Sequence, residues 1–236
     1  MEGELKLLLR QFKHKATSTY SYLIASKLNN AILIDPVKEE IKKYQKKLKE
    51  FNLKLKYAID THVHADHITA LGDLRDIYDC KTIMGEQSKV NCISQSISDG
   101  ENLYLDEIKI KAIYTPGHTD DSYCYLLNDN KKQFLFSGDT LLIKGNGRTD
   151  FQNGDPSLLF ESLHEKILIL DDETIIYPAH DYKGFKSTTI KEEKTNNHRL
   201  SMDKNTFINF MNSLNLETPK LIDIAVSLNK ECGIIK

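Results

Sequence analysis

Short apolar runs that end in Gly, Pro or polar residues recur along the whole chain. Runs rich in β-branched and aromatic residues predict β-strands. Here they cover residues 5–12, 20–25, 31–34, 57–60, 108–114, 133–136 and 174–177. A further apolar run covers residues 123–127 and contains Cys124, which we expect to be a small core residue.

Two Asp-Pro pairs mark predicted helix starts between these strands, because proline fits the first turn of a helix. The first pair, at residues 35–36, precedes an apolar stripe at intervals of three and four: Ile41, Tyr44, Leu48 and Phe51. The second pair, at residues 155–156, predicts a helix to about residue 167, and another stripe covers residues 207–214. Such alternation favours a layered α/β fold, with residues 1–236 forming one domain.

One segment after the fourth predicted strand is unusually rich in metal-type donors. His62, His64, Asp66 and His67 fall within six positions, in a chain of 236 residues that has only eight histidines. Imidazole nitrogen and carboxylate oxygen suit zinc, iron or manganese. Alternate residues of an extended segment face the same way, so His62 and His64 can converge. The alternative is that this segment is an exposed polar loop that binds no metal.

Three further donors follow later strands in the same manner. His118 comes after the strand at 108–114, Asp139 after 133–136, and His180 after 174–177. A strand that ends in Gly or Pro and then presents a donor places that donor at a sheet edge. Each residue alone could be a turn or capping residue, but their shared placement predicts a common pocket.

Composition narrows the class of protein. The chain has 32 basic and 34 acidic residues and a net charge of −2, so no basic surplus indicates nucleic-acid binding. No apolar stretch approaches the roughly 18 residues needed to span a membrane. The N-terminal residues lack the basic start and apolar run of a signal peptide, and they are not Arg- and Ser-rich like a transit peptide. We therefore expect a cytoplasmic protein.

The four cysteines show no close spacing along the chain. Residues 80, 92, 124 and 232 are far apart, and none adjoins a metal-type donor. Free thiols in a reducing cytosol are the expectation for such a pattern. We assign no nucleophilic role to any of them.

The order of motifs, from His62-x-His64-x-Asp66-His67 through His118 and Asp139 to His180, resembles that of the metallo-β-lactamase superfamily. The resemblance implies an αββα sandwich, two mixed β-sheets flanked by helices, with metal at one sheet edge. Within the superfamily, the chain is most similar to the persulfide dioxygenases, the ethylmalonic-encephalopathy-protein type. Five stretches carry this likeness: Thr61-His-Val-His-Ala-Asp-His-Ile-Thr69, Gly145-Asn-Gly-Arg-Thr-Asp-Phe-Gln152, Ile176-Tyr-Pro-Ala-His-Asp-Tyr-Lys-Gly-Phe185, Ile222-Asp-Ile-Ala-Val226 and Cys232-Gly233.

The donor set is compatible with two chemistries. His62, His118 and Asp139 could form the two-histidine, one-carboxylate triad of non-haem Fe(II) oxygenases, which leaves coordination positions open. A hydrolase of the superfamily would instead hold two ions and activate a hydroxide between them. In that case Asp66, His67 and His180 would bind the second ion, with Asp139 bridging. The number of donors does not distinguish the oxygenase from the hydrolase.

The likeness to persulfide dioxygenases implies one Fe(II) per chain, held by His62, His118 and Asp139. The other donors would orient these ligands through hydrogen bonds: His64, Asp66, His67 and His180. The implied reaction converts glutathione persulfide, O₂ and water into sulfite and glutathione. The same likeness suggests a homodimer.

Three residues are candidates for substrate contacts. Arg148 could bind a glutathione carboxylate through two parallel hydrogen bonds, although an ion pair with Asp150 or Asp155 is an equal alternative. Tyr182 and Thr119 adjoin metal-type donors in the sequence. Separately, Asn146 stands where the resemblance leads us to expect Cys or a small residue, and it could alter packing or pocket polarity.

Two other functions remain open from the sequence. The first is a glyoxalase II-type binuclear thioester hydrolase (hydroxyacylglutathione hydrolase), in which zinc could replace iron. The segment after His180 is short for the helical substrate-binding domain of such enzymes, and Asp181-Tyr182 stands where Glu-Tyr would be typical. The second is a non-catalytic metal- or sulfide-sensing protein on the same fold. Turnover of persulfide under O₂, compared with thioester hydrolysis, separates all three.

Overall fold

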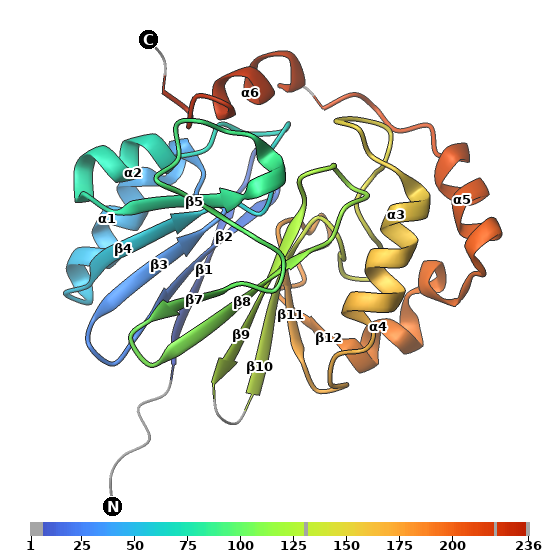
Figure 1. The fold of residues 1–236 in the computed structure, drawn as a ribbon, viewed down its shortest axis with the longest axis horizontal. Helices are drawn as coiled ribbons and strands as arrows, with labels where there is room; N and C mark the ends of the chain where they lie inside the picture. The colour runs from blue at the N-terminus through green and yellow to red at the C-terminus, as the bar shows by residue number, and fades with distance from the viewer. Residues whose placement is uncertain (1–6, 130–131, 220, 235–236) are drawn as a thin grey trace, which may run out of the picture.

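The computed structural model describes residues 7–129, 132–219 and 221–234. Two six-stranded mixed sheets lie face to face (Figure 1). The first sheet has its strands in chain order: β1 (Leu8–His14), β2 (Thr19–Ala25), β3 (Asn30–Ile34), β4 (Lys54–Ile59), β5 (Lys81–Gly85) and β6 (Gln95–Ile97). The second sheet has the order β12 (Thr188–Thr189), β11 (Ile175–Pro178), β10 (Lys132–Gly138), β9 (Tyr123–Asp129), β8 (Ile108–Tyr114) and β7 (Asn102–Leu105).

Helices cover the outer face of each sheet (Figure 1). Beside the first sheet lie the 3₁₀ turn η1 (Lys38–Glu40), α1 (Ile41–Glu50) and α2 (Leu71–Tyr78), with α6 (Ile222–Asn229) near their end. Beside the second sheet lie α3 (Pro156–Glu161), which continues as a π-helical segment to residue 167, α4 (Ile190–Asn196) and α5 (Lys204–Ser213). None of the helices in the described ranges has the length and apolar character required to cross a bilayer.

Three apolar layers hold the sandwich together, and strand β2 shows why. Its side chains point alternately to opposite faces. Tyr20, Tyr22 and Ile24 pack between the sheets, whereas Leu23 and Ala25 pack under the helices of the first sheet. A third layer lies between the second sheet and α3, α4 and α5. Burial on both faces explains why the central strands are continuously apolar.

The αββα fold expected from the resemblance is confirmed. The predicted strands at 20–25, 31–34, 57–60, 108–114, 133–136 and 174–177 each correspond to an observed strand, with ends shifted by a few residues. The strand predicted at 5–12 is observed at Leu8–His14, and residues 5 and 6 lie outside the described ranges. The helix predicted from residue 155 to about 167 is also confirmed, and Cys124 is buried in the layer under α3.

The helix predicted at Asp35-Pro36 begins later, at residue 38. Asp35 has a positive φ of 50°, and its carboxylate accepts a hydrogen bond of 2.7 Å from the Thr61 backbone N–H. Val37 pairs with Thr69 in an isolated bridge. Residues 35–37 are therefore held against the loop that carries His62, which prevents them from taking helical dihedral angles.

The expectation of four free thiols is wrong for two of them. Cys92 and Cys232 form a disulfide across a sequence separation of 140 residues, with their Cα atoms 5.9 Å apart. Cys80 and Cys124 are free and buried. The pairing cannot be recognised from spacing, because it depends on the docking of the C-terminal segment against the first sheet.

Candidate metal centre

Four strand ends bring the predicted donors to one edge of the two sheets. β4 leads to His62, β8 to His118, β10 to Asp139 and β11 to His180. Gly138 permits the close approach of β10, because its φ is 52° and a Cβ there would lie 2.8 Å from a threonine hydroxyl oxygen of the neighbouring loop. Donors from both sheets are therefore gathered in one place.

His62, His118 and Asp139 form the first donor group. One donor atom of each residue lies within 4.8 Å of the others, and His118 Nε2 lies 3.5 Å from Asp139 Oδ2. Metal–ligand bonds of about 2.1 Å place neighbouring ligand atoms about 3 Å apart. The spacing and the donor types therefore fit one ion of the kind that a two-histidine, one-carboxylate triad binds.

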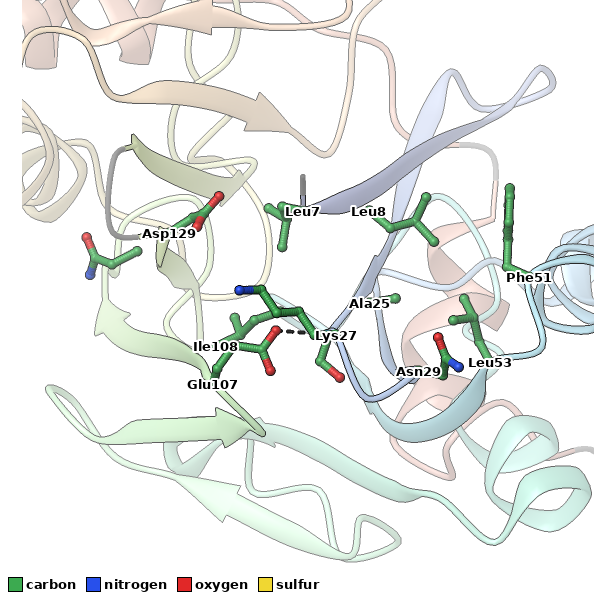
Figure 2. A pocket seen from close by; sticks show the side chains of 12 residues that line it. Leu7, Leu8, Ala25, Lys27, Asn29, Phe51, Leu53, Glu107, Ile108 and Asp129 are labelled. Atoms are coloured by element: carbon green, nitrogen blue, oxygen red, sulfur yellow. Dashed lines mark hydrogen bonds between the residues drawn. The ribbon is translucent and has the colours of Figure 1, made fainter. Parts of the chain in front are cut away.

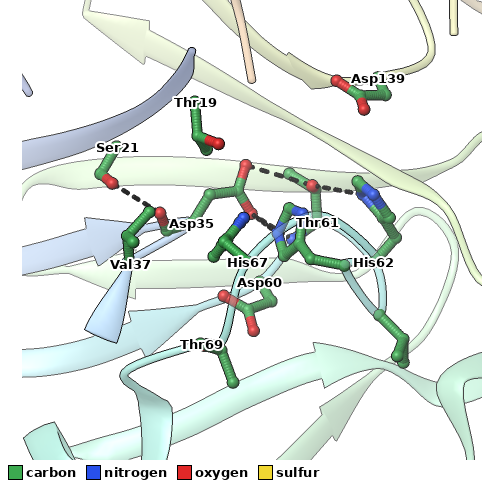
Figure 3. A network of polar contacts seen from close by, with 12 residues as sticks. Thr19, Ser21, Asp35, Val37, Asp60, Thr61, His62, His67, Thr69 and Asp139 are labelled. Carbon is green, nitrogen blue, oxygen red and sulfur yellow. Dashed lines mark hydrogen bonds and ion pairs between the residues drawn. The ribbon is translucent and has the colours of Figure 1, made fainter. Parts of the chain in front are cut away.

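Hydrogen bonds fix the tautomers of both histidines. His118 Nδ1 donates to the Arg148 carbonyl at 2.7 Å, which leaves Nε2 with its lone pair. The Thr61 hydroxyl donates to Asp35 at 3.2 Å and can therefore accept from His62 Nδ1 at 3.0 Å (Figure 3). Burial lowers the pKa of His62 well below its ordinary value. The hydrogen bonds on Nδ1 therefore leave Nε2 of each ring as the atom that faces the group, the arrangement found in metal-binding histidines.

His180 lies between two carboxylates. Its Nδ1 is 2.7 Å from Asp139 Oδ1, and its Nε2 is 3.0 Å from Asp66 Oδ2. Burial opposes a charge on His180, but these two carboxylates raise its pKa well above the ordinary value. Burial likewise tends to raise the pKa of Asp139, and the charge and hydrogen bond of His180 hold it below the ordinary value. Both ring nitrogens of His180 are thus engaged, and Asp139 keeps Oδ2 for the first group.

His64, Asp66 and His67 form a second donor group behind the first. His64 Nε2 lies 3.0 Å from Asp35, and His67 Nδ1 lies 3.1 Å from Asp66. Burial opposes protonation of His64, but the Asp35 carboxylate raises its pKa to about 9. Among the described residues, His64 Nδ1 and His67 Nε2 are buried without a hydrogen-bond partner. These two atoms are the free positions of the second group.

A pocket of about 260 Å³ opens over the first group. Arg148 and Tyr182, two of the three predicted substrate contacts, line it, and the Tyr182 ring is 74% exposed. The guanidinium of Arg148 binds both oxygens of Asp150, at 2.6 and 2.7 Å, and the carbonyl of Glu217 at 2.7 Å. This is the ion pair that the sequence offered as the alternative role of Arg148.

Two other residues singled out in the sequence lie away from this pocket. Thr119 is buried, its hydroxyl lies 2.6 Å from that of Ser122, and it is not among the residues that line the pocket. Asn146 is also buried and contacts Met211 of α5. The structure therefore assigns Asn146 to packing between the loop after β10 and helix α5.

Sequence reasoning missed Asp35, which orients His62 through Thr61 and binds His64 directly. It follows strand β3 just as the predicted donors follow theirs, so the same rule could have found it. The Asp-Pro pair pointed instead to a helix start. The pocket wall at residues 217–219 was also missed, because nothing in its composition signals a site.

A second pocket of about 260 Å³ lies at the other end of strand β8 (Figure 2). Leu7, Phe51 and Ile108 contribute apolar surface, and the Lys27 backbone N–H donates to Glu107 Oε1 at 2.8 Å. No histidine or cysteine lines it. The concentration of metal-type donors therefore distinguishes the pocket over the first group.

Comparison with known proteins agrees with this geometry. The family model of the metallo-beta-lactamase superfamily matches residues 14–91 and 97–180. Human mitochondrial persulfide dioxygenase ETHE1 is 40% identical over 230 residues, which cover 97% of this chain and 89% of that protein. A hydroxyacylglutathione hydrolase of Francisella philomiragia is 35% identical over 174 residues, covering 73% of this chain and 67% of that protein.

A solved structure gives the same assignment. The crystal structure of ETHE1 from Myxococcus xanthus superposes with a TM-score of 0.93 at 43% identity, covering 96% of this chain and 100% of that chain. The similarity to the persulfide dioxygenases thus spans almost the full chain, whereas the similarity to the hydrolase is shorter and lower. The chain belongs to the metallo-beta-lactamase superfamily and, within it, to the persulfide dioxygenase family.

Proposed function

We propose that this protein is a persulfide dioxygenase that acts on glutathione persulfide at one Fe(II) ion per chain. The reaction consumes one persulfide, one O₂ and one water, and yields glutathione, sulfite and two protons. His62, His118 and Asp139 are the proposed iron ligands. The persulfide dioxygenase relatives cover nearly the full chain, which supports the reaction class.

One observation carries the choice of a single ion. His180, which a second ion would require, has both ring nitrogens within 3.0 Å of carboxylate oxygens. It therefore acts as a hydrogen-bond donor to Asp139 and Asp66. Outer partners of this kind orient a ligand and tune its basicity.

When bound, Fe(II) would supply open positions at which sulfur and O₂ can bind side by side, and the persulfide sulfur would supply the four electrons that reduce O₂. The chain prepares this chemistry by holding Nε2 of His62 and His118 and Oδ2 of Asp139 as lone-pair donors. Each ligand is fixed by a hydrogen bond on its other side, so its orientation does not depend on the ion. Such preorganisation is the chief contribution of a protein to a metal site.

The pocket wall is suited to the peptide part of the substrate. Tyr182 stacks on His180 with ring centroids 6.0 Å apart and leaves most of its surface open to solvent. Arg148 also lines the pocket and contributes positive charge, although its guanidinium is already paired with Asp150. We assign Tyr182 the direct contact and Arg148 the support of the wall at residues 217–219.

A binuclear thioester hydrolase is the second candidate, and the second donor group favours it. One donor atom each of His64, Asp66 and His67 lies within 4.8 Å of the others. His64 Nδ1 and His67 Nε2 are also buried without a hydrogen-bond partner among the described residues. Against it, the described chain after His180 offers only the two-residue strand β12, the helices α4, α5 and α6, and a short 3₁₀ turn. In a hydrolase, one ring nitrogen of His180 would have to give up its contact with Asp139 or Asp66 in order to bind the second ion.

Three expectations from the sequence remain part of the proposal: a single domain, a homodimer and a cytoplasmic location. Light scattering after size exclusion tests the dimer, and cell fractionation tests the location. The name of the human relative places that protein in mitochondria.

Oxygen-electrode turnover tests the function. Protein loaded anaerobically with Fe(II) is expected to consume one O₂ and release one sulfite per glutathione persulfide. The same preparation is expected to leave lactoylglutathione unhydrolysed. Thioester hydrolysis without O₂ uptake would establish the second candidate, and metal binding without either activity would indicate a sensing protein.

A further inference from the structure

The loop of residues 61–69, here called the metal loop, carries His62 and the second donor group. Apart from a bridge at its last residue, it has no regular secondary structure. Buried backbone groups need hydrogen-bond partners, and distant side chains supply them. The Val63 N–H donates to Asp121 at 2.9 Å, and the Val63 carbonyl accepts from Gln152 at 2.6 Å. The first half of the loop is thus held by side chains from segments that adjoin the second sheet.

In the second half, the Lys38 N–H donates to the Ile68 carbonyl at 2.9 Å and Val37 pairs with Thr69. Three further hydrogen bonds come from one side chain, Asn229, at the end of α6. Its Nδ2 donates to the carbonyls of His64 and His67, at 2.8 and 2.9 Å. Its Oδ1 accepts from the Thr69 N–H at 2.9 Å. The side chain is 2% exposed. Every hydrogen of the amide and its oxygen are therefore used on the metal loop.

The position of Asn229 is itself fixed by the segment that follows it. Cys232 is bonded to Cys92, and its carbonyl accepts from the Gly72 N–H at 2.9 Å. Gly233 has a φ of 73°, and a Cβ there would lie 2.0 Å from the Thr69 carbonyl oxygen. The end of α6 therefore lies directly against the exit of the metal loop.

A relay of contacts connects this clamp to the first donor group. The turn between the two clamped carbonyls contains Asp66, whose Oδ2 lies 3.0 Å from His180 Nε2. His180 Nδ1 in turn lies 2.7 Å from Asp139 Oδ1. A shift of the turn would move Asp66 away from His180. His180 would then lose one of the two partners that fix its ring, and its hydrogen bond to Asp139 Oδ1 would weaken.

We propose that Asn229 is a positioning residue of the metal centre, which sets the spacing of the His64–His67 turn and thereby the orientation of Asp66, His180 and Asp139. It touches neither substrate nor any proposed ligand. Its effect on turnover rests on the proposed function, but its effect on metal retention does not.

The test compares Asn229→Ala and Asn229→Asp with a control on the same helix, Val226→Ala. Val226 packs on the core of the first sheet, one helical turn before Asn229, and its side chain has no polar group that could hydrogen-bond the metal loop. Asn229→Asp keeps the acceptor for Thr69 but loses both donors to the carbonyls. Each protein is loaded anaerobically with Fe(II), and metal release to a chelator, melting temperature, kcat and KM are measured.

Both Asn229 variants are expected to release metal about 10-fold faster, the lower end of the range for groups that hydrogen-bond metal ligands, because Asn229 acts on Asp139 through Asp66 and His180. Their kcat should fall while KM for glutathione persulfide stays near the wild-type value. Val226→Ala should lower the melting temperature and leave metal release unchanged. If the wild type retains another metal and lacks dioxygenase activity, release of that metal still tests the clamp.

Three outcomes would overturn the proposal. The first is wild-type metal release by Asn229→Asp. The second is equally fast release by Val226→Ala at the same melting temperature. The third is failure of both Asn229 variants to fold without metal, which would make the residue a general structural element.

Discussion

The two donor groups are built from the same residue types in one short motif, yet they differ in what their atoms face. In the first group, hydrogen bonds occupy Nδ1 of His62 and His118 and Oδ1 of Asp139. The remaining donor atoms, Nε2 and Oδ2, are left for the ion, and all three residues line a pocket. In the second, His64 is bound to Asp35 and buried completely. Of the second group only Asp66 lines the pocket, whereas its histidines His64 and His67 do not.

This difference shows how one motif can serve one ion or two. We propose that the choice depends on the surrounding carboxylates, because Asp35 holds His64 and the pair of Asp66 and Asp139 holds His180. A change in these outer partners would free donors without altering the motif. Function in this superfamily therefore has to be argued from hydrogen bonds as well as ligands.

The largest effect is expected from the first group. His62→Ala or Asp139→Ala should lower iron retention and O₂ consumption by more than about 100-fold, beyond the range for outer partners. His67→Ala is the matched change in the second group and should retain iron. Metal analysis after anaerobic loading checks both, and equal iron loss from His67→Ala would remove the distinction between the groups.

The next largest effect concerns the disulfide beside the clamp on the second group. Replacing Cys92 and Cys232 by serine should lower the free energy of unfolding by about 2–4 kcal/mol, because the bond closes a long loop in the unfolded chain. Chemical denaturation measures this. Reductant should destabilise the wild type and leave the double variant unchanged; an equal response of both proteins would contradict a stabilising disulfide.

His180→Ala tests the residue that links the two groups, because His180 contacts Asp139 of the first group and Asp66 of the second. It removes the hydrogen bonds to Asp139 and Asp66, so we expect a loss of about 10–100-fold in metal affinity or activity. The readouts are chelator competition and O₂ uptake. Iron loss as complete as in His62→Ala would make His180 a ligand and the assignment of ligands wrong.

The smallest effect is expected at the pocket wall. Arg148→Ala breaks a partly exposed ion pair with Asp150, worth up to about 1 kcal/mol, and frees the wall at Glu217. KM for glutathione persulfide should rise by up to about five-fold with little change in kcat. Arg148→Lys should recover only part, because lysine lacks the paired donors. An unchanged KM would exclude Arg148 from any role at the substrate site.

The fold was largely predictable because its strands are apolar runs and its donors follow strand ends. The six donors of the two groups, together with His180, were identified from local sequence, and the structure places them together. Asp35 could have been found by the same rule, but a competing helix signal obscured it.

Asn229 and the Cys92–Cys232 pair could not have been found in this way. Their roles arise where α6 docks on the metal loop, more than a hundred residues away along the chain. Neither residue stands in a local pattern typical of a site. Long-range packing of this kind is visible only in three dimensions.

Metal stoichiometry tests the central claim most directly. Protein purified and loaded without oxygen, with Fe(II) and Zn(II) both supplied, is to be analysed for metal per chain and assayed with glutathione persulfide. We predict one iron per chain and O₂ uptake proportional to it. Two ions per chain, with hydrolysis of lactoylglutathione and no O₂ uptake, would contradict the account.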